Sequence, residues 1–172
     1  MDDVDRALLA ALQADATQPY TALGRAAGLS AGSAHERVRK LRERGVVRRT
    51  TVDIDPVAVD RGMLAFVMLP ADAWMGDTPT RAALAGIPEI QEAHVIAGSA
   101  SLLVKVRTST PEHLQAVLRR LFTVEGVTGT QAVVVLETFF ERPLDLGATP
   151  SADEVPPRRA RRTEEAPPGP FG

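Results

Sequence analysis

In the first fifty residues, apolar positions recur at the spacing of helices and are interrupted by turn residues. The first run predicts a helix that Asp2 or Asp3 can cap and that ends near Ala14. A break at residues 17–19 precedes a second, shorter helix over residues 20–27. Both helices are short, so their apolar faces must pack against a third element.

That third element is a helix predicted to start at Ser30, a good N-cap, and to stop just before Gly45. The β-branched residues that follow, up to Val52, predict a small strand or wing. Three short helices separated by tight turns are typical of a helix-turn-helix domain. We assign residues 1–52 to this domain and residues 53–61 to a linker.

After the linker the pattern changes to apolar strands that alternate with amphipathic helices. The predicted order is strand 63–69, helix 78–86, strand 92–97, strand 101–107, helix 110–122 and strand 130–140. This β-α-β-β-α-β order is the ferredoxin-like arrangement, with two helices on one face of a four-stranded antiparallel sheet. The expected fold class is α+β, a winged helix-turn-helix joined to a ferredoxin-like effector and oligomerisation domain over residues 62–142.

The last predicted strand is apolar on both of its faces between Ala132 and Leu136. Helices cover only one face of the sheet, so the other face needs a partner. A second copy packing sheet against sheet would supply it, and we expect at least a dimer. Residues 143–172 are rich in Pro, Arg, Glu and Gly and are predicted to be a disordered tail.

The formal net charge of −2 hides a division along the chain. Residues 1–50 hold nine Lys/Arg and six Asp/Glu (9 − 6 = +3), whereas residues 51–140 hold six and ten (6 − 10 = −4). The absence of cysteine excludes disulfides, thiolate catalysis and Cys-ligated zinc. The acidic N-terminus and the lack of a long apolar run predict neither a secretory signal nor a membrane segment, so we expect a cytoplasmic protein.

The positive charge of the first domain gathers on its third predicted helix. The core-facing stripe is Ala34, Val38 and Leu41, and small residues at the leading end would let the helix approach base edges. Its cations would mainly meet phosphates, and His35 would contact a phosphate or its own helix. The predicted DNA-contacting residues are Ser30, Ala31, Gly32, Ser33, His35, Arg37, Arg39, Lys40, Arg44, Arg48 and Arg49.

Residues 2–9 (DDVDRALL), Leu29-Ser30, residues 36–41 (ERVRKL) and residues 45–47 (GVV) carry a family resemblance. With the ferredoxin-like second domain, the chain resembles the leucine-responsive regulators, the Lrp/AsnC or feast/famine family, over residues 2–142. The resemblance implies regulation of transcription through double-stranded DNA. It also implies assembly into dimers and octamers, with amino-acid effectors bound between dimers.

The resemblance places the effector cleft at the turn between the second and third strands, a Gly-x-Tyr-Asp sequence in the family, and at a Thr-rich start of the last strand. Here the turn lacks the aromatic and acidic residues, and Ser101 cannot neutralise an ammonium group as a carboxylate would. The alternative is that the turn is only a hairpin and the cleft has lost its ligand. The expected effector-binding residues are His94, Gly98, Ser99, Ala100, Ser101, Thr130, Gln131 and Ala132.

The sequence therefore predicts an oligomeric, sequence-specific transcription regulator controlled by a small-molecule effector, an amino acid or a related metabolite. The alternative is an architectural DNA-compacting protein with little sequence preference or no ligand. An enzyme is not expected, because the three histidines lack metal-ligand spacing and the chain has no phosphate-binding loop or nucleophile motif. No cofactor or metal is expected.

Overall fold

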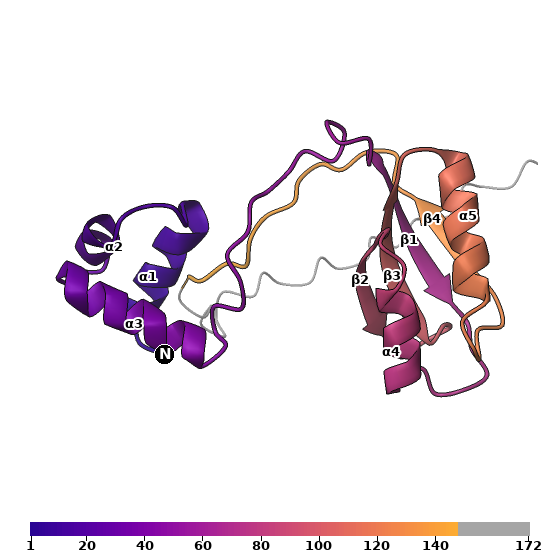
Figure 1. Ribbon diagram of the computed structural model, residues 1–172, viewed down its shortest axis with the longest axis horizontal. Helices are drawn as coiled ribbons and strands as arrows, with labels where there is room; N and C mark the ends of the chain where they lie inside the picture. The colour runs from indigo at the N-terminus through magenta and orange to yellow at the C-terminus, as the bar shows by residue number, and fades with distance from the viewer. Residues whose placement is uncertain (148–172) are drawn as a thin grey trace, which may run out of the picture. The chain divides into compact units, whose positions relative to one another are not determined.

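The computed structural model describes residues 1–147, which fall into two compact units (Figure 1). The first unit is Met1–Thr50 together with the described residues that follow Arg142, and the second is Thr51–Arg142. The first unit holds only helices, and the second holds a sheet and two helices. Of the predicted tail, residues 143–147 form no helix or strand, and residues 148–172 lie outside the described part of the chain.

The helical unit consists of α1 (Asp3–Ala14), α2 (Tyr20–Ala26) and α3 (Ala31–Glu43). Their apolar faces meet in a small core of Leu8, Leu23, Ala34 and Val38. The turn between α2 and α3 is tight, because the Leu29 N–H donates to the Gly24 carbonyl at 2.7 Å. A side chain at residue 24 would place its Cβ 2.6 Å from the Leu29 carbonyl oxygen, so this turn requires glycine. The predicted helix-turn-helix is confirmed.

The predicted wing is wrong: residues 46–52 form no strand in the described part of the chain. The Val46 and Val47 N–H groups instead donate to the Leu41 carbonyl, at 2.9 and 3.2 Å, and complete the C-terminal end of α3. Val52 is 74% exposed. β-branched residues favour an extended backbone, but a strand also needs a partner, and this unit supplies none among its described residues.

The second unit has the predicted β-α-β-β-α-β order. Its elements are β1 (Met63–Leu69), α4 (Thr78–Ala85), β2 (Ile90–Val95), β3 (Leu102–Thr108), α5 (Pro111–Phe122) and β4 (Gln131–Val134). The strands pair antiparallel in the order β2-β3-β1-β4. β2 and β4 are therefore the two edges of the sheet.

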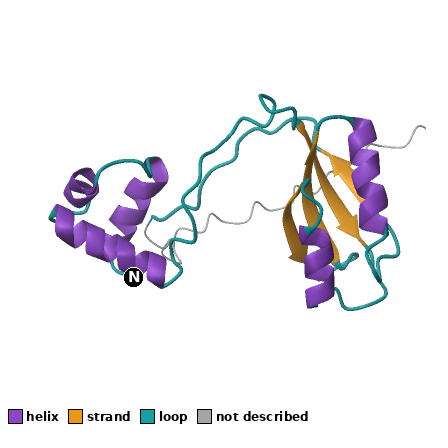
Figure 2. Cartoon of the chain, in the orientation of Figure 1, coloured by secondary structure: helices purple, strands orange, loops and turns teal. Residues whose placement is uncertain are grey.

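Both helices of this unit lie on one face of the sheet (Figure 2), over a core formed by every second strand residue. Val67 on β1 and Val104 and Val106 on β3 are fully buried there against Val117 and Leu121 of α5. Arg120 fastens α5 to the segment before β2, because it donates to Glu89 at 3.1 Å and to the Gly86 carbonyl at 3.0 Å. The other face of the sheet carries no helix.

The last strand is shorter than the predicted 130–140, because β1 pairs with it only from Ala65 to Met68. One more backbone hydrogen bond follows, from the Val135 N–H to the Leu64 carbonyl at 2.9 Å. Between Val135 and Arg142 three large apolar side chains are exposed: Leu136, Phe139 and Phe140. The apolar pattern predicted a strand there, but the partner strand ends first.

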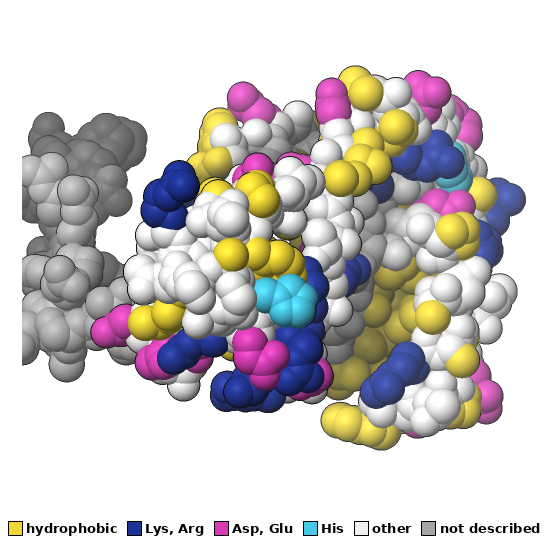
Figure 3. Space-filling view, turned by 60° about the vertical axis from the view of Figure 1, so that its left-hand side comes forward, with side chains coloured by type: hydrophobic (Ala, Val, Ile, Leu, Met, Phe, Trp, Pro, Cys, Tyr) yellow, Lys and Arg dark blue, Asp and Glu magenta, His cyan; other side chains and the backbone are white. Residues whose placement is uncertain are grey.

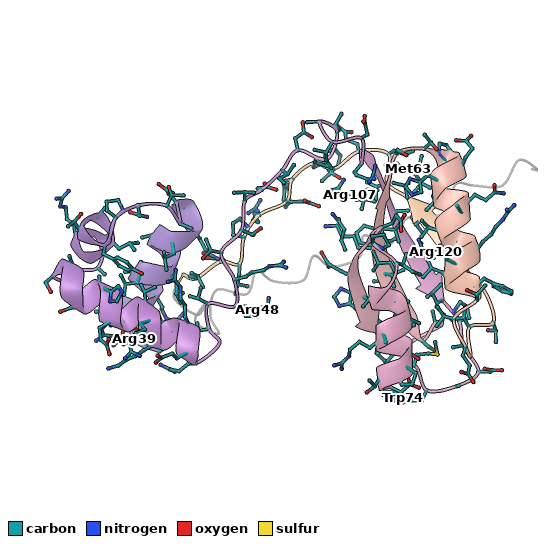
Figure 4. The ribbon with its side chains drawn as sticks, in the orientation of Figure 1. Arg39, Arg48, Met63, Trp74, Arg107 and Arg120 are labelled. Atoms are coloured by element: carbon teal, nitrogen blue, oxygen red, sulfur yellow. The ribbon has the colours of Figure 1, made fainter. Side chains whose placement is uncertain are left out.

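The loop between β1 and α4 holds Trp74, the single tryptophan of the chain. Its side chain is 75% exposed and lies at the end of the sheet where α4 begins (Figure 4). A Cβ on Gly76 would come within 2.6 Å of the indole ring, so the ring packs directly on the backbone of this loop.

Candidate DNA-binding helix and effector site

α3 buries a stripe of Ala34, Val38 and Leu41. We call the side of the helix opposite this stripe its outward face. At helical spacing, Gly32, Ser33, Glu36, Arg39, Lys40 and Glu43 lie on the opposite side of the helix. Ser30 caps the helix by accepting a hydrogen bond from the Ser33 N–H at 3.2 Å. The four predicted residues at the leading end, Ser30 to Ser33, therefore form the first turn of an exposed helix.

Carboxylates accompany the cations on this outward face. Arg39 donates to Glu36 at 2.7 and 2.9 Å and also pairs with Glu43, while the Lys40 ammonium lies 3.5 Å from Glu36. The hydrogen bond from Arg39 lowers the pKa of the Glu36 carboxyl to about 2, and the same pairing raises the pKa of Arg39. The outward face is consequently a network of both charges.

Two of the predicted DNA-contacting residues, Arg37 and His35, contact other helices of their own unit. The Nη1 of Arg37 donates to Asp2 and to Asp5, at 2.8 Å in each case, although both acids belong to the start of α1. The His35 ring meets the Tyr20 ring of α2 edge to face, with the ring centroids 4.8 Å apart. Neither side chain is fully buried.

Three other predicted cations, Arg44, Arg48 and Arg49, lie at the end of α3 and just after it. They are exposed and make no ion pair with any described residue, and the same holds for Arg42 in the last turn of the helix. Dark blue and magenta side chains mix on the helical unit, at the front left of Figure 3, and Figure 4 marks Arg39 and Arg48.

The predicted effector residues lie on two separate strand ends. Gly98 to Ser101 form the turn between β2 and β3, where Ala100 is buried and the Ser101 N–H donates to the Leu69 carbonyl at 3.0 Å. Thr130 to Ala132 begin β4, at the other side of β1. The separation from β3 to β4 is about 10 Å, or two strand spacings. Within one chain the two segments are therefore separated by β1.

Some of these residues nevertheless share the uncovered face of the sheet. The register places His94 opposite Leu103, Leu103 opposite Met68, and Met68 opposite Gln131, which makes one row across all strands. Strand alternation puts Thr130 and Ala132 on the other face, and Thr130 lines a hollow of about 310 Å³ beside α5. His94 is held by Glu92 at 3.2 Å.

The next rows of the uncovered face combine apolar and charged residues. Phe66 lies between Lys105 and Val133, and Leu64 lies beside Arg107. Glu141 pairs with Lys105 at 3.1 Å and with Arg107 at 3.6 Å, so the segment after β4 returns across this face. The sequence prediction did not single out these two cations, although both occupy the polar positions of an alternating strand.

Residues 1–147 offer neither a cluster of metal ligands nor a membrane-spanning helix. No group of three or more His, Asp or Glu side chains there could hold a metal ion. None of the helices in this part of the chain is long and apolar enough to cross a membrane. The two candidate surfaces are the exposed, charged face of α3 in the first unit and the partly apolar, uncovered sheet face in the second.

Sequence comparisons identify both units. The AsnC-type helix-turn-helix domain matches residues 1–42, and the Lrp/AsnC ligand binding domain matches residues 71–145. The transcriptional regulator FL11 of Pyrococcus horikoshii is 36% identical over 141 residues, which are 82% of this chain and 93% of that protein. The regulator LrpA of Mycobacterium tuberculosis is 35% identical over 142 residues, with 81% and 93% covered.

Solved structures agree with the sequence matches. The leucine response regulatory protein LrpA of M. tuberculosis superposes with a TM-score of 0.76 at 31% identity, covering 86% of this chain and all of that one (100%). The feast or famine regulatory protein of M. tuberculosis, crystallised with L-methionine, gives a TM-score of 0.78 at 32% identity, with 85% and 99% covered. With an AsnC-type helix-turn-helix domain in one unit and an Lrp/AsnC ligand binding domain in the other, the chain belongs to the Lrp/AsnC family of transcriptional regulators.

Proposed function

We propose that this regulator reads double-stranded DNA with the outward face of α3. The single observation that carries the proposal is the exposed, capped first turn of α3, whose small residues can enter a major groove. Ser33 lies where a base edge would be met, and Lys40, Arg44, Arg48 and Arg49 would meet phosphates on either side. Arg39, which Glu36 and Glu43 partly neutralise, would contribute less.

Mixed charge on the reading helix favours sequence-specific regulation over architectural DNA compaction. A protein that wraps DNA through phosphates alone gains from every unpaired cation and loses from every acid. Glu36 and Glu43 both lie on the outward face of α3, so non-specific attraction is reduced. Discrimination must then come from contacts to base edges, and the two acids also penalise badly fitting sites.

The uncovered sheet face supports assembly of at least a dimer. Phe66 and Val133 are neighbours in the register and are both exposed, although each is apolar. A second copy laid on this face would bury both side chains and would pair two reading helices about one axis. The expected DNA site is then a pseudo-palindrome with half-sites spaced by whole helical turns.

Effector binding between subunits is the remaining part of the proposal. The two predicted effector segments lie apart in one chain, so a complete cleft needs residues from a second subunit. A relative in this family has been crystallised with L-methionine, which makes amino acids the first class to test. A ligand that prefers one assembly would shift the equilibrium between assemblies and so change DNA binding. We infer a non-catalytic role in the cytoplasm.

The deciding experiment selects binding sites from random-sequence duplexes and then measures competition at physiological salt. We expect the selected duplex to bind at least about a thousandfold tighter than an unrelated duplex of equal length. Equal competition by unrelated DNA would exclude specific regulation and leave the architectural function. A thermal-shift screen of amino acids tests the effector separately, since a ligand at a hundred times its Kd stabilises by about 2.7 kcal/mol.

A further inference from the structure

We propose that Arg37 is a positioning residue that locks the reading helix to α1, and that its guanidinium does not contact DNA. The inference rests on the proposed role of α3 in reading DNA. Arg37 was expected among the DNA contacts because it lies on the cationic side of the helix. Its partners in the folded unit give it a different task.

The contact joins parts of the chain that are far apart in sequence. One nitrogen of Arg37 donates to Asp2 and to Asp5, which are 35 and 32 residues away. Asp5 is buried, with only 8% of its surface exposed, so this end of the contact is shielded from water. Asp2 accepts the Asp5 N–H with its other oxygen, at 2.8 Å, so the same carboxylate caps α1 and holds α3.

The contact fixes the rotation of α3 about its own axis. The buried stripe of Ala34, Val38 and Leu41 sets the general orientation, and two polar contacts flank it on opposite sides. One is Arg37 with α1, and the other is His35 with Tyr20 of α2. A rotation of about 20° would move side-chain atoms at a radius of about 5 Å by roughly 2 Å. That displacement exceeds what a hydrogen bond to a base edge tolerates.

Local charge opposes a direct contact between Arg37 and a phosphate. Two carboxylates surround one guanidinium, so the cluster of Asp2, Asp5 and Arg37 carries a net charge of −1 (1 − 2). A phosphate brought to this point would be repelled by Asp2, which is half exposed. Arg44 and Arg48 have no such acid partner among the described residues and suit phosphate contacts far better.

The test compares Arg37→Gln, Asp5→Asn and their double variant with the control Lys40→Gln, in the full-length chain. Asp2→Asn is added because asparagine still caps a helix and Asp2 is exposed, so this variant folds. Each protein is titrated with the selected duplex and with an unrelated duplex over a range of salt concentrations. Circular dichroism and hydrogen exchange establish the temperature at which every variant is folded.

We expect Arg37→Gln and Asp5→Asn each to weaken binding to the selected duplex about tenfold or more, the loss of one base contact. Asp2→Asn should give a smaller loss, and the double variant should be no worse than either single one. Binding to unrelated DNA should change less than about twofold, with the same salt slope. Lys40→Gln should instead weaken binding to both duplexes and reduce the salt slope by about 0.9.

Two results would overturn the proposal. If Arg37→Gln reduced the salt slope as Lys40→Gln does, Arg37 would be a phosphate contact. If Asp5→Asn tightened binding, the acids would be competing with DNA for Arg37 rather than positioning it. The salt slope on unrelated DNA tells a phosphate contact from a positioning role even if the wild-type chain shows no sequence preference. A lack of sequence preference would count against the proposed function and not against the role of Arg37.

Discussion

Replacing Val133 by glutamate tests whether the uncovered sheet face is a subunit interface. Val133 lies on β4, opposite Phe66, and 52% of its surface is exposed. It makes no part of the core under α4 and α5, so a charged side chain there leaves the fold of the single chain intact. Any large effect must therefore come from contacts that a second chain makes.

The expected magnitude follows from the exposed half of the side chain. Full burial of a valine is worth at least about 1.5 kcal/mol, so the half still exposed has about 0.8 kcal/mol to gain in a dimer. A carboxylate left among apolar side chains costs about a further 2 kcal/mol after relaxation. A two-fold interface contains the position twice, which brings the total to about 6 kcal/mol. The dimer Kd should rise by roughly ten-thousandfold, since each 1.4 kcal/mol is tenfold.

Sedimentation velocity over a wide range of protein concentrations measures this shift. Val133→Ala provides a graded variant: alanine keeps one of the three side-chain carbons, so about 1 kcal/mol is lost per dimer and the Kd rises about sixfold. Ala82→Glu is the matched control, because Ala82 is exposed on α4, which covers the other face of the sheet. An unchanged Kd for Val133→Glu, or an equal loss for Ala82→Glu, would refute the assignment of the interface to this face.

Three further predictions concern single positions. Glu36→Gln should tighten binding to unrelated DNA several-fold and steepen the salt slope by up to about one, by anisotropy titration. Because the pKa of Glu36 is about 2, its carboxylate stays ionised at pH 5, so the difference in affinity between wild type and Glu36→Gln should be the same at pH 5 as at pH 7; a difference that vanished at pH 5 would contradict the proposed ion pairing. Val38→Ala should destabilise the helical unit by about 2–3 kcal/mol, because Val38 is fully buried in its core. Hydrogen exchange in the second unit should stay unchanged, and an equal change in both units would contradict their independence. Asp77→Ala should lower the Tm of the second unit by a few degrees at pH 7, because Asp77 caps α4 by accepting the Thr80 N–H at 2.7 Å. Hydrogen bonds from the Thr80 side chain and from the Thr80 N–H lower the pKa of Asp77, so its stabilisation is present above the ordinary value of 3.8 and lost as the pH falls through the lowered pKa. The difference in Tm between wild type and Asp77→Ala should therefore shrink at pH 3, and a constant difference would argue against the cap.

Helix positions could be predicted closely from the sequence because their signals are local. Asp2 or Asp3, and Ser30, were expected as N-caps from their own type and the residues that follow; Asp2 and Ser30 accept the expected hydrogen bonds. The ferredoxin-like order was equally accessible, since strand and helix periods differ. The β-branched residues up to Val52 led to the wrong prediction of a wing, because a strand depends on a partner strand that the local pattern does not reveal.

The candidate sites were harder to predict because they depend on distant contacts. Helical spacing placed Arg37 on the cationic side of α3 but gave no sign of Asp2 and Asp5, more than thirty residues earlier in the chain. The two predicted effector segments do lie at strand ends, but the face of the sheet on which each residue lies depends on the pairing register. His94 and Gln131 share the uncovered face, while Thr130 turns toward α5. No local pattern fixes that division.

The placement of Trp74 gives the chain a built-in spectroscopic division between its units. The single tryptophan lies in the second unit, and the single tyrosine, Tyr20, lies in the first, against His35. Excitation at the red edge of the absorption band selects the indole, so fluorescence reports on the second unit alone. Excitation at shorter wavelengths also excites the phenol, whose emission lies to the blue of the indole emission and follows the helical unit in the same sample. Melting of the helical unit and of the second unit can thus be recorded separately, without a label and without cutting the chain.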